Sequence, residues 1–249
     1  MQQLKKVILF FSFFMVIVAA QSQNRYYDYK DRNPEGKVHI LYMGGGSYHD
    51  YLSVAEVLRK FLEVRHEYHI TYSEDYSVFT RPLDKYDVIL LAGMPKKLEK
   101  EELTGFLTAV KEGKSVIGLH AATAALSKDK QRIEYTKVIG AQFAGHPPIY
   151  RFPVEIKEEN HPITKNIGPF DIYDEMYFFK NMQEGTTVLL EAEHEERGRT
   201  AIAWVREYGK GKIFYTTFGH AAQSAGNRYF QQLLLNALEW MTEDVKKSK

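Results

Sequence analysis

Short apolar runs alternate with segments of helical periodicity through the first half of the chain, and this order limits the possible folds more than any other feature. The expected strands are residues 38–43, 66–72, 87–93 and 115–119. Between them, apolar residues recur at helical spacing over 54–62 and 99–112, as on the buried face of a helix. Strands and helices in this order, joined by short connections, predict a doubly wound parallel sheet with helices on both faces.

The second half of the chain changes character, because its expected strands follow one another without long helices between them. These strands are residues 151–157, 187–192, 200–206 and 212–218, and the last two are joined by a glycine-containing turn at 207–211. Apolar residues at helical spacing over 230–241 predict a closing helix. We therefore expect one α/β domain over residues 37–243, with a mostly parallel sheet and an antiparallel C-terminal extension.

The N-terminus has the pattern of a secretory signal peptide. Lys5 and Lys6 precede an apolar run over residues 7–20, which is shorter than the ~20 residues that a membrane span needs. The run ends in small residues at the positions that a signal peptidase reads. We expect a signal peptide at 1–20, an irregular lead-in at 21–36, and an exported protein, periplasmic or extracellular, that leaves the membrane after cleavage. An uncleaved N-terminal anchor is the alternative.

Composition excludes several classes of function. Lys and Arg number 33 against 32 Asp and Glu, so the chain lacks the basic excess that nucleic-acid binding normally requires. Cysteine is absent, which removes disulfides, thiolate metal sites and cysteine nucleophiles. Aromatic residues make up 14% of the chain, and they serve equally well in a core or as platforms for sugar rings.

A glycine-rich loop follows the first expected strand. Gly44 and Gly45 would let the backbone approach a ligand closely, and His49, Asp50 and Tyr51 come just before the first expected helix. The loop matches neither a dinucleotide fingerprint nor a phosphate-binding loop, so a nucleotide is not indicated. The alternative is a tight turn in which His49 and Asp50 are surface residues that cap the helix.

Histidines follow two further strands of the expected sheet. His120 comes directly after 115–119 among small residues, in the layout of a nucleophile elbow with an imidazole in place of Ser or Cys. His220 closes the strand at 212–218, and the acidic pair Asp174-Glu175 could orient a histidine. Since ligands of such sheets bind beyond the carboxyl ends of the strands, these side chains are candidates for acid–base chemistry. Capping and surface roles are the alternative.

Taken together, the motifs resemble those of the ThuA-like (trehalose utilisation) family, over nearly all of the chain after residue 37. The matching segments are Gly44-Gly45 with His49-Asp50-Tyr51, Gly118-Leu119-His120-Ala121-Ala122, Gly145-His146-Pro147, His161-Pro162-Ile163-Thr164, Asp174-Glu175 with Tyr177, and Phe218-Gly219-His220. The resemblance implies a flavodoxin-like sheet similar to class I glutamine amidotransferases. His120 stands where those enzymes carry a cysteine, which rules out amide transfer through a thioester. The family is associated with trehalose, related disaccharides and 3-keto sugars.

From these motifs we expect an exported enzyme that acts on a disaccharide, glycoside or keto sugar by histidine and carboxylate chemistry. His120, Glu175 and His220 are the expected catalytic residues, with His120 moving protons. The expected substrate-binding residues are Gly44, Gly45, His49, Asp50, Tyr51, His146, Asp174 and Tyr177. The partner is a small carbohydrate, and no oligomeric state follows from the sequence.

Two alternatives compete with this expectation. The first is a non-catalytic sugar-binding module that uses crevice aromatics such as Tyr48, Tyr51 and Tyr177. The second is a hydrolase in which His120, His146 and His220 surround zinc, although the sequence has no close ligand spacing such as HxH. No cofactor is expected under the acid–base interpretation, and zinc is the one that the second alternative requires.

Overall fold

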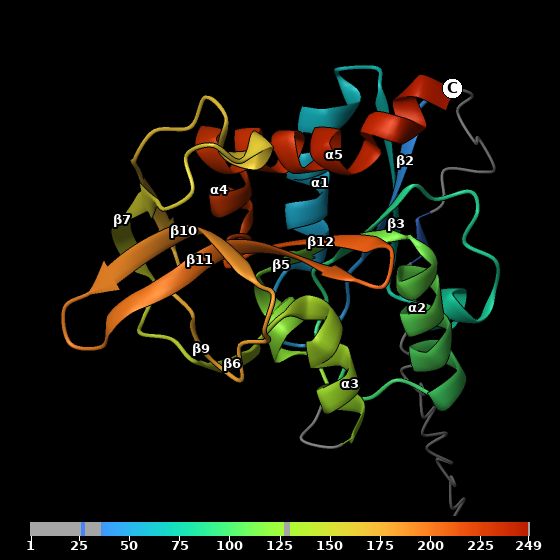
Figure 1. Ribbon diagram of the computed structural model, residues 1–249, viewed down its shortest axis with the longest axis horizontal. Helices are drawn as coiled ribbons and strands as arrows, with labels where there is room; N and C mark the ends of the chain where they lie inside the picture. The colour runs from blue at the N-terminus through green and yellow to red at the C-terminus, as the bar shows by residue number, and fades with distance from the viewer. Residues whose placement is uncertain (1–25, 28–35, 127–129, 249) are drawn as a thin grey trace, which may run out of the picture.

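The computed structural model describes residues 26–27, 36–126 and 130–248. The expected signal peptide and most of the expected lead-in lie outside the described residues, although Tyr26–Tyr27 of that lead-in form a short strand. The main sheet has ten strands (Figure 1). Their spatial order is β1 (Tyr26–Tyr27), β3 (Tyr68–Ser73), β2 (Val38–Met43), β4 (Val88–Leu91), β5 (Ser115–Leu119), β12 (Gly211–Thr216), β11 (Gly198–Tyr208), β10 (Thr187–His194), β7 (Tyr150–Ile156) and β8 (Phe170–Asp174).

The five central strands form the parallel block that the sequence predicts. Neighbours in the order β3-β2-β4-β5-β12 all pair in parallel. The chain passes from β2 to β3 on one side and then returns to β4 on the other side of β2, so the strand order reverses between β2 and β4. In such sheets the crevice beyond the carboxyl ends of the strands, at the reversal, is where ligands bind.

The antiparallel extension is also confirmed, because β12, β11, β10, β7 and β8 pair antiparallel in that order. The β11–β12 turn contains Gly209, whose φ of +62° suits a glycine. A second, two-stranded sheet pairs β6 (Gln142–Gly145) with β9 (Phe178–Lys180). The sequence did not indicate β6, β8 or β9, because they are short and their side chains are only partly buried or alternate over few residues.

Helices cover both faces of the parallel block (Figure 1). One face carries α1 (Tyr51–Glu63), α4 (Ala222–Ala225) and α5 (Arg228–Ser248), and the other carries α2 (Lys100–Glu112) and α3 (Lys130–Ile139). Alternate residues of β2 divide between the two cores: Ile40 and Tyr42 pack with α1 and α5, while Leu41 and Met43 pack toward α2. Short 3₁₀ helices occur at η1 (Tyr76–Thr80), η2 (His120–Ala124) and η3 (Pro162–Thr164).

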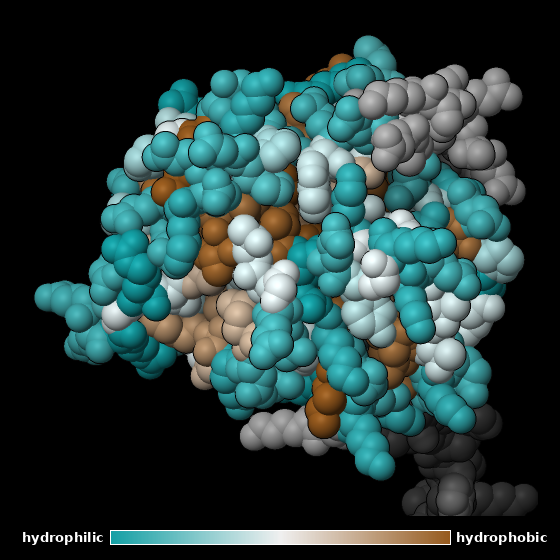
Figure 2. Space-filling model, viewed as in Figure 1, coloured by the Kyte–Doolittle hydropathy of each residue, from teal (hydrophilic) through white to brown (hydrophobic). Residues whose placement is uncertain are grey.

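The visible surface is mainly hydrophilic, with apolar residues in small separate groups (Figure 2). Within the described part of the chain, no helix combines the length and the apolar character needed to cross a membrane.

The close approach of α2 to η1 depends on Gly105. A Cβ at this position would lie 1.9 Å from the main-chain oxygen of Phe79. We expect Gly105→Ala to destabilise the protein by about 2–3 kcal/mol, because α2 must move away from η1. Urea unfolding checks this. Thr104→Ala, at the exposed neighbouring position, is the matched control and should leave the midpoint unchanged or raise it slightly, because Ala is the better helix former. A midpoint that does not fall in Gly105→Ala would contradict the close packing.

His39 is a buried histidine of β2 that lies away from the ends of the strands where the site is expected. Its side chain is 4% exposed, its Nε2 lies 2.7 Å from Oγ1 of Thr71, and its ring packs against His69 and Tyr86. Burial, followed by the neighbouring His69, lowers the pKa of His39 to about 4. Lys85 and Asp87 also lie close enough to contribute, with Asp87 opposing the shift.

This shift gives a pH dependence of stability with a defined sign. Below pH 6.5 the unfolded chain takes up a proton at His39 that the folded protein does not, so stability falls as the pH drops from about 6.5 to about 4. Between pH 7 and pH 5 this residue alone should lower the free energy of unfolding by about 2 kcal/mol. Urea unfolding of the wild type and of His39→Gln at both pH values tests it. Equal pH dependence in the two proteins would contradict the assignment.

Candidate active site

Three histidines from separate loops meet at the carboxyl edge of the parallel block. His49 follows β2, His120 follows β5 and His220 follows β12. The ring of His49 lies 4.8 Å from that of His120 and 5.0 Å from that of His220, and the last two rings are 5.3 Å apart. The structure therefore brings together imidazoles that the sequence placed only at the ends of strands. We call His49, His120 and His220 the histidine cluster.

The carboxylate of Glu175 lies beside this cluster and reaches a fourth histidine as well. Its Oε2 lies 3.2 Å from Nε2 of His120 and 3.3 Å from Nδ1 of His220, the latter at ion-pair distance without hydrogen-bond geometry. Its Oε1 lies 3.5 Å from Nδ1 of His146, which follows β6. One nearly buried carboxylate thus contacts imidazoles from three different segments of the chain.

His120 is held rigidly at the base of the site. Its φ is +42°, an uncommon conformation for a residue with a Cβ, and the hydroxyl of Tyr215 donates to its main-chain oxygen. Nδ1 lies 2.7 Å from the carbonyl oxygen of Thr217, which can only accept, so Nδ1 carries a hydrogen. Nε2 lies 2.8 Å from the hydroxyl of Tyr177. The ring is 1% exposed, so both its tautomer and its orientation are fixed.

The environment shifts the pKa values of the groups around the cluster in different directions. Burial lowers the pKa of His49 to about 4, and the other imidazoles act in the same sense. The Glu175 carboxylate raises the pKa of His220 above its ordinary value. Burial alone would raise the pKa of Glu175, but His120 and His220 outweigh it and hold that pKa well below its usual range. Burial also raises the pKa of Tyr177 well above its usual range, so its hydroxyl keeps its proton.

Asp174 lies behind the site, which corrects the expectation that it binds substrate. The side chain is fully buried. Its Oδ1 accepts from the main-chain N–H of Glu175 at 2.8 Å, and its Oδ2 accepts from the N–H of Gly219 at 3.0 Å and from the hydroxyl of Ser224. Because these partners adjoin Glu175 and His220, Asp174 sets the positions of both. Sequence reasoning missed Ser224 and Thr217, since neither stands in a pattern that sets it apart.

Most of the glycine loop also has a structural role. Gly44 and Gly45 are buried, and a Cβ on Gly44 would overlap the ring of Tyr72. Asp50 accepts from the N–H of Ser53 at 3.1 Å and caps α1, the alternative stated from the sequence. The ring of Tyr51 is 6% exposed. Of the five residues expected to bind substrate in this loop, His49 alone joins the cluster.

His146 and Tyr177 form the wall beside the cluster. The rings of His146 and Tyr177 are stacked at 5.7 Å, and Phe143 packs 4.5 Å from Tyr177. Tyr177 is 2% exposed and its hydroxyl is bonded to His120, so it positions that histidine instead of facing a substrate. The side chain of His146 is 36% exposed. The zinc alternative named His146 with His120 and His220, whereas the structure places His49 within 4.8 Å of those two histidines.

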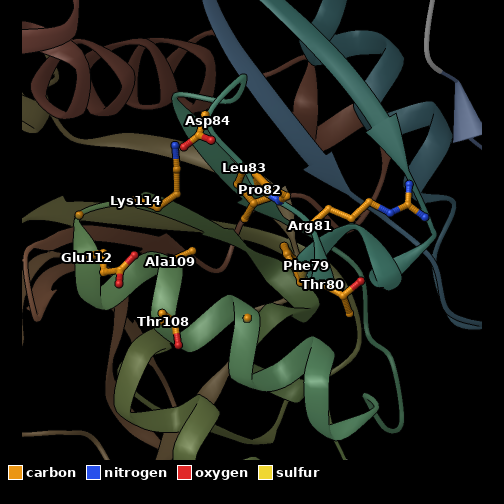
Figure 3. Close-up of a pocket in the computed structure, with 12 residues that line it drawn as sticks. Phe79, Thr80, Arg81, Pro82, Leu83, Asp84, Thr108, Ala109, Glu112 and Lys114 are labelled. Carbon is orange, nitrogen blue, oxygen red and sulfur yellow. The ribbon is translucent and has the colours of Figure 1, made fainter.

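A hollow of about 590 Å³ lies elsewhere, between α2 and the segment 79–84 (Figure 3). Figure 3 shows Lys114 and Asp84 on one side of it and Thr108, Ala109 and Glu112 of α2 on the other. None of its lining residues belongs to the site around Glu175. The ammonium group of Lys114 donates to the carbonyl oxygen of Tyr86.

Removing the charge of Asp174 should loosen the site and the fold together. We expect Asp174→Asn to lower the free energy of unfolding by about 2–4 kcal/mol, since a side-chain amide nitrogen would face N–H donors in a buried place. Urea unfolding measures the loss. Ser224→Ala, which removes one of the three donors, should lose about 1 kcal/mol. Equal losses for the two variants would mean that the carboxylate is not the centre of this network.

Comparison with known proteins confirms both the expected fold and the family that the sequence motifs resemble. A putative ThuA-like protein from Parabacteroides merdae superimposes with a TM-score of 0.72 at 19% identity, over 84% of this chain and 91% of that chain. Another putative ThuA-like protein, from Bacteroides uniformis, superimposes with a TM-score of 0.69 at 22% identity, over 88% of this chain and 96% of that chain. A glutamine amidotransferase from Thermotoga maritima superimposes with a TM-score of 0.53 at 15% identity, over 83% of this chain and 98% of that chain, which agrees with the expected fold. No curated protein matched the sequence.

The sequence itself matches a family model over almost the whole described domain. Residues 37–241 fit the model of the ThuA family, whose description is trehalose utilisation. This match spans the parallel block, the antiparallel extension and every residue of the site around Glu175. The chain therefore belongs to the ThuA family.

Proposed function

We propose that this protein is an exported enzyme that acts on a keto derivative of a disaccharide or glycoside by proton transfer. The observation that carries the proposal is the contact of the Glu175 carboxylate with His146, beside three further histidines at the end of a parallel sheet. Such a cluster of ionisable side chains, with shifted pKa values and partial exposure, is typical of a catalytic site.

The substrate class is supported by the family. A family described as trehalose utilisation has a carbohydrate-related role, and the site contains the polar groups that bind sugar oxygens. A sugar with a carbonyl at carbon 3 has an acidic hydrogen at carbon 2, so a positioned base can act on it without a covalent nucleophile. The absence of cysteine is consistent with such chemistry.

His146 is the better candidate for the base than His120, the residue expected from the sequence. His120 has both nitrogens bonded and is 1% exposed, so a substrate would not reach it. In His146, the carbonyl oxygen of Pro147 lies 2.8 Å from Nδ1 and Glu175 lies 3.5 Å from the same atom. Nδ1 therefore carries a hydrogen, and Nε2 has the lone pair that can accept a proton. A carboxylate near Nδ1 orients an imidazole base in this way.

The proposed reaction is an elimination that needs no oxidant or reductant. Nε2 of His146 takes the proton from carbon 2, and the electron pair of that C–H bond forms a double bond between carbons 1 and 2. The bond from carbon 1 to the glycosidic oxygen breaks with its electron pair on oxygen. The imidazolium then returns the proton to that oxygen, which leaves as an alcohol or a sugar hydroxyl.

Export is supported by the N-terminal pattern alone, with Lys5 and Lys6 before the apolar run of 7–20. We place the enzyme in the periplasm or outside the cell. N-terminal sequencing of the protein recovered from the host envelope or medium tests this, with a start near residue 21 expected.

Replacement of His146 or Glu175 should lower turnover much more than it weakens substrate binding. We expect His146→Ala and Glu175→Gln to lower kcat on 3-keto-trehalose by about 100-fold or more, with smaller changes in KM. Product analysis by mass spectrometry follows the reaction. His194→Ala, on the β10–β11 hairpin, is the control and should keep wild-type kcat.

Two results would contradict this proposal. Full activity of His146→Ala would show that His146 is not the base. Saturable binding of 3-keto-trehalose without turnover by the wild type would instead favour the sugar-binding module.

A further inference from the structure

We infer that His49, His120 and His220 together bind one divalent transition-metal ion of the zinc class. Each residue offers one imidazole nitrogen, and the three nitrogens lie within 4.8 Å of one another. They come from the loops after β2, β5 and β12, so the parallel block itself holds the set together. The role of the ion rests on the proposed function, whereas its binding does not.

An unpartnered buried nitrogen supports this inference. Nδ1 of His49 is buried and has no hydrogen-bond partner among the described residues. Nδ1 of His220 is likewise buried without hydrogen-bond geometry to any partner, although Glu175 lies 3.3 Å away. Buried polar atoms are normally paired, and an unpaired one commonly marks the place of a water or an ion. An ion among the three rings would supply the missing partner.

His120 is already arranged as a metal ligand. Histidines that bind metals usually donate their other ring N–H to a carbonyl or carboxylate, which fixes the tautomer and aims the free nitrogen at the ion. The carbonyl oxygen of Thr217 accepts from Nδ1 of His120 in this way, which leaves Nε2 as the nitrogen available to an ion. Without an ion, Nε2 lies 2.8 Å from the hydroxyl of Tyr177 and 3.2 Å from Oε2 of Glu175. Tyr177 and the ion therefore compete for one atom.

The ligand set determines the class of ion. Three imidazoles suit zinc, cobalt, nickel or copper, whereas magnesium and calcium prefer oxygen ligands. Zinc with three protein ligands keeps an open position for a water or substrate oxygen. Zinc–nitrogen bonds are about 2.1 Å long, which places two nitrogens of a tetrahedral site about 3.4 Å apart, so nitrogens separated by as much as 4.8 Å must move closer together. Gly45 and Gly46, with φ values of +94° and +131°, precede His49 and allow that adjustment.

In the proposed reaction the ion would polarise the sugar carbonyl. His146 would still take the proton from carbon 2, and Glu175 would still orient His146. This division differs from the zinc hydrolase considered from the sequence, in which His146 was itself a ligand. It also gives His120 a role that its burial permits.

Calorimetry with ZnCl₂ tests the inference on the untagged mature protein, with its expected start near residue 21, after treatment with EDTA and dialysis. The expected result is one zinc ion bound per chain, with no heat from MgCl₂. His49→Ala and His220→Gln should each weaken zinc binding by about 10-fold or more, and circular dichroism checks that both are folded. His146→Ala is the matched control and should bind zinc as the wild type does. Tyr177→Phe, which removes the competing hydroxyl, should bind zinc at least as tightly.

No zinc binding by the wild type, wild-type affinity in His49→Ala, or weaker binding in Tyr177→Phe would each overturn this inference. The measurement does not use turnover, so the two proposals fail separately. Activity of the metal-free protein on 3-keto-trehalose would leave the proposed function standing without the ion. Zinc binding without turnover would overturn the proposed function alone.

Discussion

The carboxylate of Glu175 is the group on which the site depends. A charge removed from water is unfavourable unless oppositely charged or hydrogen-bonding groups surround it, and here three imidazoles face its two oxygens. The position of Glu175 is fixed in turn by Asp174, whose Oδ1 accepts from the main chain of Glu175 while Oδ2 accepts from Gly219. The antiparallel extension, which carries both acidic residues, is therefore tied to the parallel block, which carries His120 and His220. Neither half makes the site alone.

The parts of the fold with strong periodicity were predictable from sequence. The strands of the parallel block are buried on both faces, so their continuous apolar runs stand out, and α1, α2 and α5 each have one clear apolar face. The positions of His49, His120 and His220 followed from the same pattern, since each comes after such a strand. The sequence pattern did not predict α3, because its apolar side chains do not gather on one face, or the short strands β6 and β9.

The site was only partly predictable, because burial decides the role of a polar side chain and burial is not visible in a motif. Asp174 and Glu175 are neighbours of the same chemical type, yet one is enclosed by three donors and the other faces histidines. Gly44 lies in a glycine-rich segment of the kind that binds ligands, but it is glycine because a side chain there would overlap the ring of Tyr72. His120 stands at the elbow where a nucleophile is expected, and its two hydrogen bonds turn it into a fixed part of the wall.

The pairing of β5 with β12 has a consequence for how this site can vary. Leu119 lies opposite Thr216, so the next residues along the two strands, His120 and Thr217, are also neighbours. The imidazole Nδ1 of His120 donates to the main-chain oxygen of Thr217 just beyond the last regular pair. The register of β5 and β12 therefore sets the positions of the imidazoles that follow these strands. Core exchanges that conserve volume leave this alignment in place, whereas a single residue gained or lost between Gly211 and Gly219 would shift which residue of that strand lies beside His120.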